Sequence, residues 1–300
     1  MTDKASPLLT VLIPTHGRSE LLARTLATLG ACRLPPTYRE TVVIENGPAA
    51  GAEGVVASAS AVHPALRLRY LHVERANKSH ALNEALETVG DGLVVFFDDD
   101  VRLDPGVLEA YAAAAGVERN AFFGGSVRID YEEEPPHWLV PYMPYSARGF
   151  ELDSTDRPGE YLGFNWAAFS GDICAAGGFD PAYGPGSPTG ATGQETRMQY
   201  QLSKRGVKPV DVPGAVVWHY VPRERCSEEW LVRRRFRSGM ELGRRARMEG
   251  QRVEFVSELA SVLRCSASVV KQTFRRHRAG RWGAAIGLSR SVGFIKGYIS

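Results

Sequence analysis

The chain has few cysteines and no long apolar run. Its four cysteines, in 300 residues, stand far apart and form no CxxC pair, which argues against a zinc site or a disulfide framework. Free thiols are typical of a reducing compartment. The stretch from Met1 to Pro7 lacks the apolar segment of a signal peptide, and no run of about 18 apolar residues occurs. These absences predict a cytoplasmic protein without a membrane-spanning helix.

Glycine is scarce after the first apolar run. The predicted strand Leu8 to Ile13 leads into Pro14-Thr15-His16-Gly17-Arg18, which contains one glycine. This turn cannot form the GxGxxG loop of a nicotinamide-dinucleotide domain. It is also too sparse in glycine and basic residues to be typical of a nucleotidyltransferase, which must grip a triphosphate.

Acidic residues are unevenly distributed. Residues 221–300 contain 18 Lys and Arg, seven Glu and no Asp, a balance of +11, although the whole chain carries only +2. The remainder therefore carries −9. This asymmetry predicts two regions, 1–220 and 221–300.

Strand-like and helix-like patterns alternate in the first hundred residues. Strands are expected at 8–13, 41–44, 68–71 and 93–97, and helices near 19–30, 51–62 and 78–89. This alternation is typical of right-handed βαβ units and predicts an α/β fold with a mostly parallel sheet flanked by helices.

Later segments complete the predicted organisation. We expect a helix at 105–116, a strand at 121–129, an irregular stretch at 131–159, a flexible or linking loop at 184–193 and a helix at 195–202. Helices at about 228–250, 253–278 and 282–298 form a basic helical appendage.

Three consecutive aspartates follow the apolar run at 93–97. If the extended geometry continues, Asp98 and Asp100 point the same way and Asp99 points elsewhere. Ligands of open α/β sheets bind at the carboxyl ends of strands, and paired carboxylates suit a hard divalent cation. No Lys or Arg cluster adjoins them in the sequence, so we expect a metal ion to neutralise a bound diphosphate. The alternative is a solvated acidic turn.

Several motifs occur together in a fixed order. They are Val11 to Arg18, Val42 to Gly47, Asn77 to Ala85, Phe96 to Asp100, Gly177-Gly178-Phe179-Asp180, Gly193-Gln194-Glu195-Thr196 and Trp218-His219. This order, over roughly residues 8–220, resembles the family 2 glycosyltransferases. That family has the GT-A fold and uses nucleotide-diphosphate sugars. The resemblance therefore implies a catalytic domain with two halves, a nucleotide-sugar-binding half at about 1–103 and an acceptor half at about 104–220.

The resemblance implies roles for individual residues. Asp100, Asp98 and His219 would hold Mn²⁺ or Mg²⁺, and Glu195 would be the catalytic base of an inverting transfer. The implied donor-binding residues are Pro14, Thr15, Arg18, Glu45, Asn77, Asn83, Asp98 and Asp99. Two positions depart from the family pattern, because Glu45 stands for an aspartate and Gln194-Glu195 stands for a Glu-Asp pair.

Structural roles compete with these assignments. Glu195 is also suited to the first turn of a helix, and His219 to a satisfied position in the core. Asn77 and Asn83 are alternatively helix-capping and packing residues, and Arg18 an exposed residue at a helix start.

The sequence predicts a metal-dependent glycosyltransferase with a UDP-sugar as the expected donor. A nucleotidyltransferase and a non-catalytic sugar-nucleotide-binding protein are the alternatives. The acceptor is open among a saccharide, a lipid-linked saccharide, a peptide and a small metabolite. Residues 221–300 suggest peripheral contact with the inner face of a membrane, through the segment Trp282 to Ile299, or else docking on the catalytic domain or on a second subunit. Nucleic acid is not an expected partner.

Overall fold

The computed structural model describes residues 6–152, 159–188, 190, 192–248, 250–274 and 278–299. Parts of the expected stretch 131–159, of the loop 184–193 and of the segment Met1 to Pro7 lie outside these residues. The chain divides into two compact units, Met1–Asp130 with Gly149–Tyr220, and Tyr131–Arg148 with Val221–Ser300. Residues 131–148, which the sequence analysis assigns to the first region, therefore group with the second.

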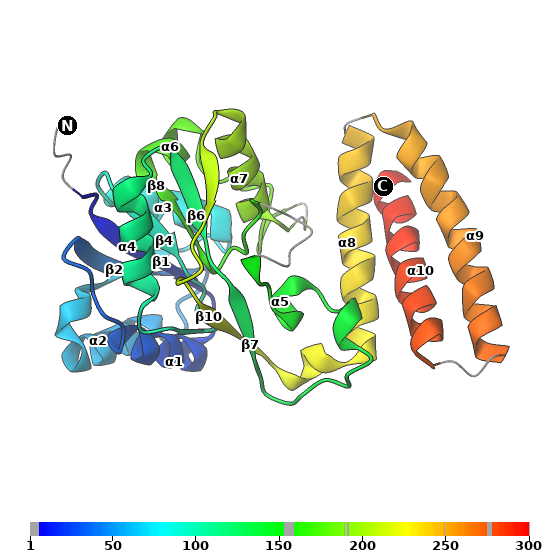
Figure 1. Ribbon diagram of the computed structural model, residues 1–300, viewed down its shortest axis with the longest axis horizontal. Helices are drawn as coiled ribbons and strands as arrows, with labels where there is room; N and C mark the ends of the chain where they lie inside the picture. Colours follow the sequence, from blue (N-terminus) through cyan, green and yellow to red (C-terminus); the bar gives the residue numbers. More distant parts are fainter. Residues whose placement is uncertain are drawn as a thin grey trace. The chain divides into compact units, whose positions relative to one another are not determined.

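The first unit is built on a seven-stranded sheet in the order β3-β2-β1-β4-β8-β6-β9 (Figure 1). Its strands are β1 Leu9–Thr15, β2 Tyr38–Asn46, β3 Leu68–Val73, β4 Leu93–Phe96, β6 Ala121–Gly124, β8 Trp166–Phe169 and β9 Lys208–Asp211. Neighbouring strands are parallel except at β8, which is antiparallel to both β4 and β6. This confirms the predicted α/β class with a mostly parallel sheet.

Helices flank this sheet. They are α1 Ser19–Gly30, α2 Ala52–Val62, α3 Lys78–Thr88, α4 Val107–Val117, α6 Ser170–Ala175 and α7 Gln194–Lys204, with the short 3₁₀ turn η1 Pro64–Leu66. β1 and β4 are buried along their whole length, as the apolar runs predict for central strands covered on both faces. Beside them, the ring of Phe96 stacks on Trp166 at 4.7 Å and meets Phe179 edge-on at 5.5 Å.

The strand expected at 121–129 is in fact two strands in different sheets. β6 ends at Gly124, and β7 Val127–Tyr131 joins a three-stranded sheet in the order β5-β10-β7. The other two strands of that sheet are β5 Val101–Leu103 and β10 Val217–Val221. A side chain at Gly125 would lie 1.8 Å from the carbonyl oxygen of Ala215, so only glycine fits where the chain passes from one sheet to the other.

The second unit is helical. Its elements are η2 Val140–Tyr142, α5 Tyr145–Arg148, η4 Arg223–Cys226, α8 Glu228–Met248, α9 Arg252–Phe274 and α10 Arg278–Ile299. The hydroxyl of Ser227 accepts a hydrogen bond from the backbone N–H of Trp230, which caps α8 as its sequence predicts. Within this unit α10 lies between α8 and α9 (Figure 1).

Glycines let α8 and α10 approach closely. A side chain at Gly293 or Gly297 of α10 would lie 2.1 or 2.0 Å from the backbone carbonyl of Phe236 or Met240 on α8. Ile286 and Phe294 of α10 are buried. These two apolar residues of the segment Trp282 to Ile299 therefore pack inside the helical unit itself, a contact that none of the expected alternatives named. No helix among the described residues is both long and apolar enough to cross a membrane.

Candidate active site

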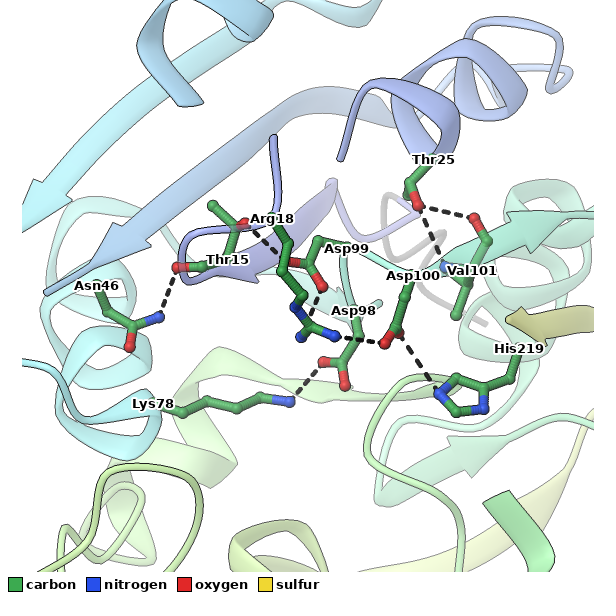
Figure 2. Close-up of polar contacts among 10 residues, drawn as sticks. All are labelled: Thr15, Arg18, Thr25, Asn46, Lys78, Asp98, Asp99, Asp100, Val101 and His219. Carbon is green, nitrogen blue, oxygen red and sulfur yellow. Dashed lines mark hydrogen bonds and ion pairs between the residues drawn. The ribbon is translucent and has the colours of Figure 1, made fainter. Parts of the chain in front are cut away.

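The three aspartates lie at the carboxyl end of β4 and diverge. β4 ends at Phe96 and the chain turns, so the extended geometry needed to align Asp98 with Asp100 does not persist. The carboxylate of Asp98 pairs with Lys78, at 2.5 Å from Nζ to Oδ1. Asp99 and Asp100 instead share the guanidinium of Arg18, at 2.8 and 2.6 Å (Figure 2). The aspartates that act together are therefore Asp99 and Asp100.

Two protein cations lie within this acidic cluster. Arg18 follows Gly17, which has a φ of +64°, and so comes from the turn after β1, while Lys78 is the first residue of α3. Arg18 and Asp100 are 82 positions apart in the sequence, and Lys78 and Asp98 are 20 apart. No local cluster of charged residues in the sequence therefore indicates either ion pair. No Lys or Arg cluster adjoins the aspartates in the sequence, yet two cations lie beside them in the structure, because folding brings separate strand ends and helix starts to one sheet edge.

Burial and charge act against each other at these groups. Burial raises the pKa of Asp99 to about 6, although the adjacent Arg18 and the hydrogen bond from Thr15 pull it down. Burial works against the charge of Arg18, but Asp100, Asp99 and Asp98 outweigh it and raise the pKa of the guanidinium. At Lys78 burial is likewise outweighed, by Asp98 first and also by Glu195, so its pKa is raised. Both cations stay charged at neutral pH.

His219 reaches the cluster because two short strands pair. β10 runs antiparallel to β5 with His219 opposite Val101, the residue after Asp100. The hydroxyl of Thr25 fixes this point, since it donates to the carbonyl of Val101 at 2.8 Å and accepts from its N–H at 3.2 Å. The ring of His219 stacks on Phe164, with centroids 4.4 Å apart, and its Nε2 lies 3.5 Å from Oδ1 of Asp100.

The side chains of Asp100 and His219 fit a divalent cation. Two cis ligands of an octahedral ion with bonds of about 2.1 Å are separated by roughly 3 Å, close to the observed 3.5 Å. Both side chains are buried and held by the sheet and ring contacts above. Within the described part of the chain, no three His, Cys, Asp or Glu side chains are grouped as a metal site, and Asp98 is turned toward Lys78.

The other residues from the first strand lie at the same edge. The hydroxyl of Thr15 donates to Oδ2 of Asp99 at 2.6 Å, and the carbonyl of Thr15 accepts from the amide of Asn46 at 2.8 Å. Pro14 lines a small pocket next to the cluster. These contacts connect the ends of β1, β2 and β4.

Glu45 is buried at the end of β2 and engaged by the protein itself. It accepts hydrogen bonds from the hydroxyl of Tyr70 at 2.6 Å and the N–H of Ala50 at 2.7 Å. Burial tends to raise its pKa, but these hydrogen bonds, with a longer one from Ala52, outweigh it and lower the pKa. Glu45 thus stabilises the turn into α2, and the structure brings it to the sheet edge but not into contact with the aspartates.

Asn77 and Asn83 hold a neighbouring loop. Asn77 caps α3 by accepting from the N–H of His80, and its amide donates to the carbonyls of Pro181 and Gly186 at 2.9 and 3.3 Å. Asn83 exchanges two hydrogen bonds of 2.8 Å with the backbone of Phe179. Their side chains therefore make the capping and packing contacts that the sequence analysis kept as the alternative to donor binding.

Glu195 lies in the first turn of α7 and lines the small pocket next to the cluster, a crevice too narrow to hold a water molecule. The pocket is lined by Pro14, Lys78, Leu82, Phe96, Phe97, Gly163, Trp166, Phe179, Gln194 and Glu195. A side chain at Gly163 would lie 3.0 Å from the carboxyl carbon of Glu195, so glycine leaves room for that carboxylate. A carboxylate, an ammonium group and four aromatic side chains thus line one recess beside the aspartates.

Sequence comparison identifies the family. The family described as Glycosyltransferase like family 2 matches residues 6–240, more than three quarters of the chain. The chain belongs to this family. The matched residues include the aspartate cluster and the pocket that Glu195 lines.

Two relatives and one solved structure extend the comparison. The chain is 29% identical over 252 residues to validoxylamine A glucosyltransferase of Streptomyces hygroscopicus subsp. limoneus, covering 74% of this chain and about half, 53%, of that protein. It is 26% identical over 235 residues to the succinoglycan biosynthesis protein ExoM of Rhizobium meliloti, covering 77% and 72%. A mannosyltransferase of Pyrobaculum calidifontis, solved with GDP-Man and Mn²⁺, matches with a TM-score of 0.62 at 17% identity, covering 97% of this chain and 88% of the other. The fold is therefore GT-A, as the resemblance implied.

Sequence reasoning missed Lys78 and Thr25 as site residues. Lys78 stands within a quoted motif and next to Asn77, so its position at the start of a helix was the available signal. Thr25 and Phe164 act through the backbone of Val101 and the ring of His219, and nothing in the sequence pattern indicates either contact.

Proposed function

We propose that this protein is a glycosyltransferase that moves a sugar from a nucleotide-diphosphate sugar to an acceptor hydroxyl. The observation that carries the proposal is the cluster of Asp98, Asp99 and Asp100 at the carboxyl end of β4, beside the pocket that contains Glu195. Ligands of open α/β sheets bind at this edge. Support comes from the glucosyltransferase relative and from the mannosyltransferase of the same fold, whose structure contains GDP-Man and Mn²⁺.

In this proposal Asp100 and His219 hold Mn²⁺ or Mg²⁺, with Asp98 as the further ligand predicted from sequence. When bound, the ion supplies positive charge that stabilises the diphosphate leaving group. Asp98 can turn toward the ion only by leaving Lys78, which then becomes available to the phosphates of the donor. In this proposal Lys78 thus changes partner within the cluster, while Arg18 keeps its pairs with Asp99 and Asp100.

Arg18 and Lys78 contribute to donor binding through charge. They reach the aspartates from two different elements, Arg18 from the turn after β1 and Lys78 from the first residue of α3 (Figure 2). A guanidinium can donate two parallel hydrogen bonds to a phosphate, and an ammonium group acts as a compact point charge. Thr15 fixes the carboxylate of Asp99, so that residue orients Arg18 rather than moving toward the donor.

Glu195 is proposed as the catalytic base. As the acceptor oxygen forms its bond to the anomeric carbon, the bond from that carbon to the diphosphate oxygen breaks, and the acceptor proton passes to the carboxylate of Glu195. A single displacement of this kind inverts the anomeric configuration. The diphosphate leaves as an anion, so one base is enough, and general-base catalysis contributes typically ~10² to 10⁴ in rate.

The pocket walls favour this chemistry. Trp166 and Phe179 present apolar rings beside Glu195, and such walls limit the access of water to the reacting carbon. Lys78 lies in the same pocket, and the effect of Glu195 on its pKa places the two charges within interaction range. The cation and the carboxylate can therefore serve the leaving group and the acceptor at the same time.

Product analysis tests the proposal. Purified protein is incubated with Mn²⁺ and a panel of UDP-sugars, our expected donors, and GDP-sugars, with saccharide, lipid-linked, peptide and small-metabolite acceptors. We expect a nucleoside diphosphate and a glycosylated product, both lost in Asp100→Asn. Release of pyrophosphate would indicate a nucleotidyltransferase, and donor binding without any product would indicate a binding protein.

The cysteine usage leads us to propose a cytoplasmic location.

A further inference from the structure

One face of α9 exposes a regular row of apolar side chains. We call this row the outer seam, and its members are Val253, Val256, Ala260, Leu263, Ala267, Val270 and Phe274. All seven are exposed, and Val253, Leu263 and Phe274 are 84%, 74% and 85% exposed. The steps along the chain are 3, 4, 3, 4, 3 and 4, which is the heptad spacing of a coiled-coil seam.

The opposite face of α9 is already occupied by its own chain. Phe255 stacks on Tyr298 of α10 with centroids 4.6 Å apart. Glu258 is buried and accepts hydrogen bonds from Arg290 at 2.5 Å and Ser291 at 2.6 Å, both on α10. Because residues two positions apart on a helix point about 200° apart, the outer seam faces away from these contacts.

The outer seam is large for an exposed surface. Its members, with the adjacent Leu259, expose on the order of 700 Å² of mostly apolar area, against roughly 800 Å² per partner in a standard protein interface. Monomeric proteins rarely expose a contiguous apolar patch of more than a few hundred Å². A partner that covers this area is therefore expected.

The narrowness of the seam favours a helix as that partner. Apart from Leu259, the flanking positions of the seam include the polar residues Ser257, Arg264, Ser266, Lys271 and Thr273. A helix that lies in a membrane interface has a broad apolar face rich in Trp, Phe and Leu, whereas a strip of two residues per heptad matches a single neighbouring helix.

Side-chain sizes along the seam indicate how that helix runs. Ala260 and Ala267 alternate with the larger Val256, Leu263 and Val270. In a parallel pair of identical helices each residue meets itself, so the Ala260 and Ala267 layers leave voids between the leucine and valine layers. In an antiparallel pair each alanine faces a leucine or valine, so the four central layers each combine one small and one large side chain, and Val253 faces Val270 at either end.

Charge is compatible with a second copy in this orientation. The register that sets Ala260 against Leu263 of the second copy also sets Arg264 near Ser257 of the second copy, so no like charges oppose each other there. The pairing is reciprocal, because Ala260 of each copy faces Leu263 of the other, as the two-fold interface of a homodimer requires. We propose that α9 forms an antiparallel helix pair with α9 of a second copy of this chain, through the outer seam.

Sedimentation equilibrium of the full chain tests this surface. The wild type should be dimeric at micromolar concentrations and dissociate on dilution. Val256→Glu and Leu263→Glu should each weaken the dimer by about 10-fold or more, because each buries an unpaired carboxylate. Val62→Glu is the matched control, since Val62 is 70% exposed on α2 and Val256 is 64% exposed on α9. This control should dimerise as the wild type does.

Circular dichroism confirms that each variant keeps its helices, and Ala267→Glu provides a third site if one variant unfolds. A wild type that is monomeric at about 100 μM would overturn the proposal, as would a dimer that resists all three seam variants. Flotation with anionic vesicles by a monomeric wild type, lost in Leu263→Glu, would assign the seam to a membrane and would equally overturn it. None of these outcomes depends on glycosyltransferase activity.

Discussion

The guanidinium of Arg18 lies 2.6 Å from the carboxylate of Asp100, and the same group reaches Asp99 at 2.8 Å. Both carboxylates are buried, whereas the side chain of Arg18 is 38% exposed. The acidic cluster is thus neutralised from its solvent side by a residue of the first turn. This pairing links the folding of β1 to the chemistry proposed at the end of β4.

Arg18→Gln should destabilise the protein, because two buried carboxylates lose their shared cation. Breaking a fully buried pair costs ~3–5 kcal/mol, and the partial exposure of Arg18 reduces this to roughly 1–3 kcal/mol. Chemical denaturation provides the measurement. Arg33→Gln serves as the control, since Arg33 pairs with Glu109 at the same 2.6 Å on the surface. Equal losses in the two variants would contradict a special role for the buried pair.

The contribution of Glu45 to stability should depend on pH. Its hydrogen bonds from Tyr70 and Ala50 favour the ionised form, so its folded-state pKa lies below the unfolded value. The stabilisation is therefore complete above about pH 4.5 and is lost as the pH falls through the lower folded-state pKa. The stability difference between wild type and Glu45→Gln should shrink from pH 6 toward about pH 3. If this stability difference instead grew on acidification, the folded-state pKa of Glu45 would be raised and not lowered.

Lys78→Met should weaken donor binding, in addition to the stability that is lost when the Lys78–Asp98 pair is broken. The variant keeps the length of the side chain but removes the charge that pairs with Asp98 and faces the proposed phosphate position. One charge-assisted contact is worth about 1.5–3 kcal/mol, or roughly 10- to 100-fold in Kd. Titration calorimetry with a nucleotide sugar measures this loss. Lys204→Met, at the end of α7, is the control and should bind as the wild type does.

Glu195→Gln should reduce sugar transfer by roughly 10² or more, because the amide keeps the shape of the side chain but cannot accept the acceptor's proton. Metal and donor affinity should be unchanged. Nuclear magnetic resonance of the product should show an inverted anomeric centre. Transfer at nearly the wild-type rate, or retention of configuration, would remove Glu195 from this role.

The central strands and most helices could be predicted because their signals are local. The apolar runs of β1 and β4, and the helix start at Ser227, follow from periodicity and capping alone. The division of residues 121–129 between two sheets could not be foreseen, since it depends on the close approach of Ala215 to Gly125.

The candidate site was predicted in composition more than in arrangement. The aspartates, His219 and Glu195 were named from motifs, and the structure brings them to one edge of the sheet. Which carboxylate meets which cation depends on where β4 ends and on the register of β10 against β5, and neither is encoded in a local pattern. For Asn77 and Asn83 the motif was recognisable in the sequence, but the contacts that the two side chains make were not. Both hydrogen-bond to the backbone of a neighbouring loop and position it.

Metal-dependent donor binding at Asp100 tests the central claim most directly. Thermal unfolding is followed with Mn²⁺ alone, with UDP- and GDP-sugars alone, and with both, for the wild type, Asp100→Asn and the surface control Asp130→Asn. A donor at 100 times its Kd adds about 2.7 kcal/mol to the stability of the folded state. The account predicts a rise in Tm for the wild type and the control only when metal and donor are both present, and none for Asp100→Asn. The same rise in Asp100→Asn, or in the wild type with excess EDTA, would contradict it.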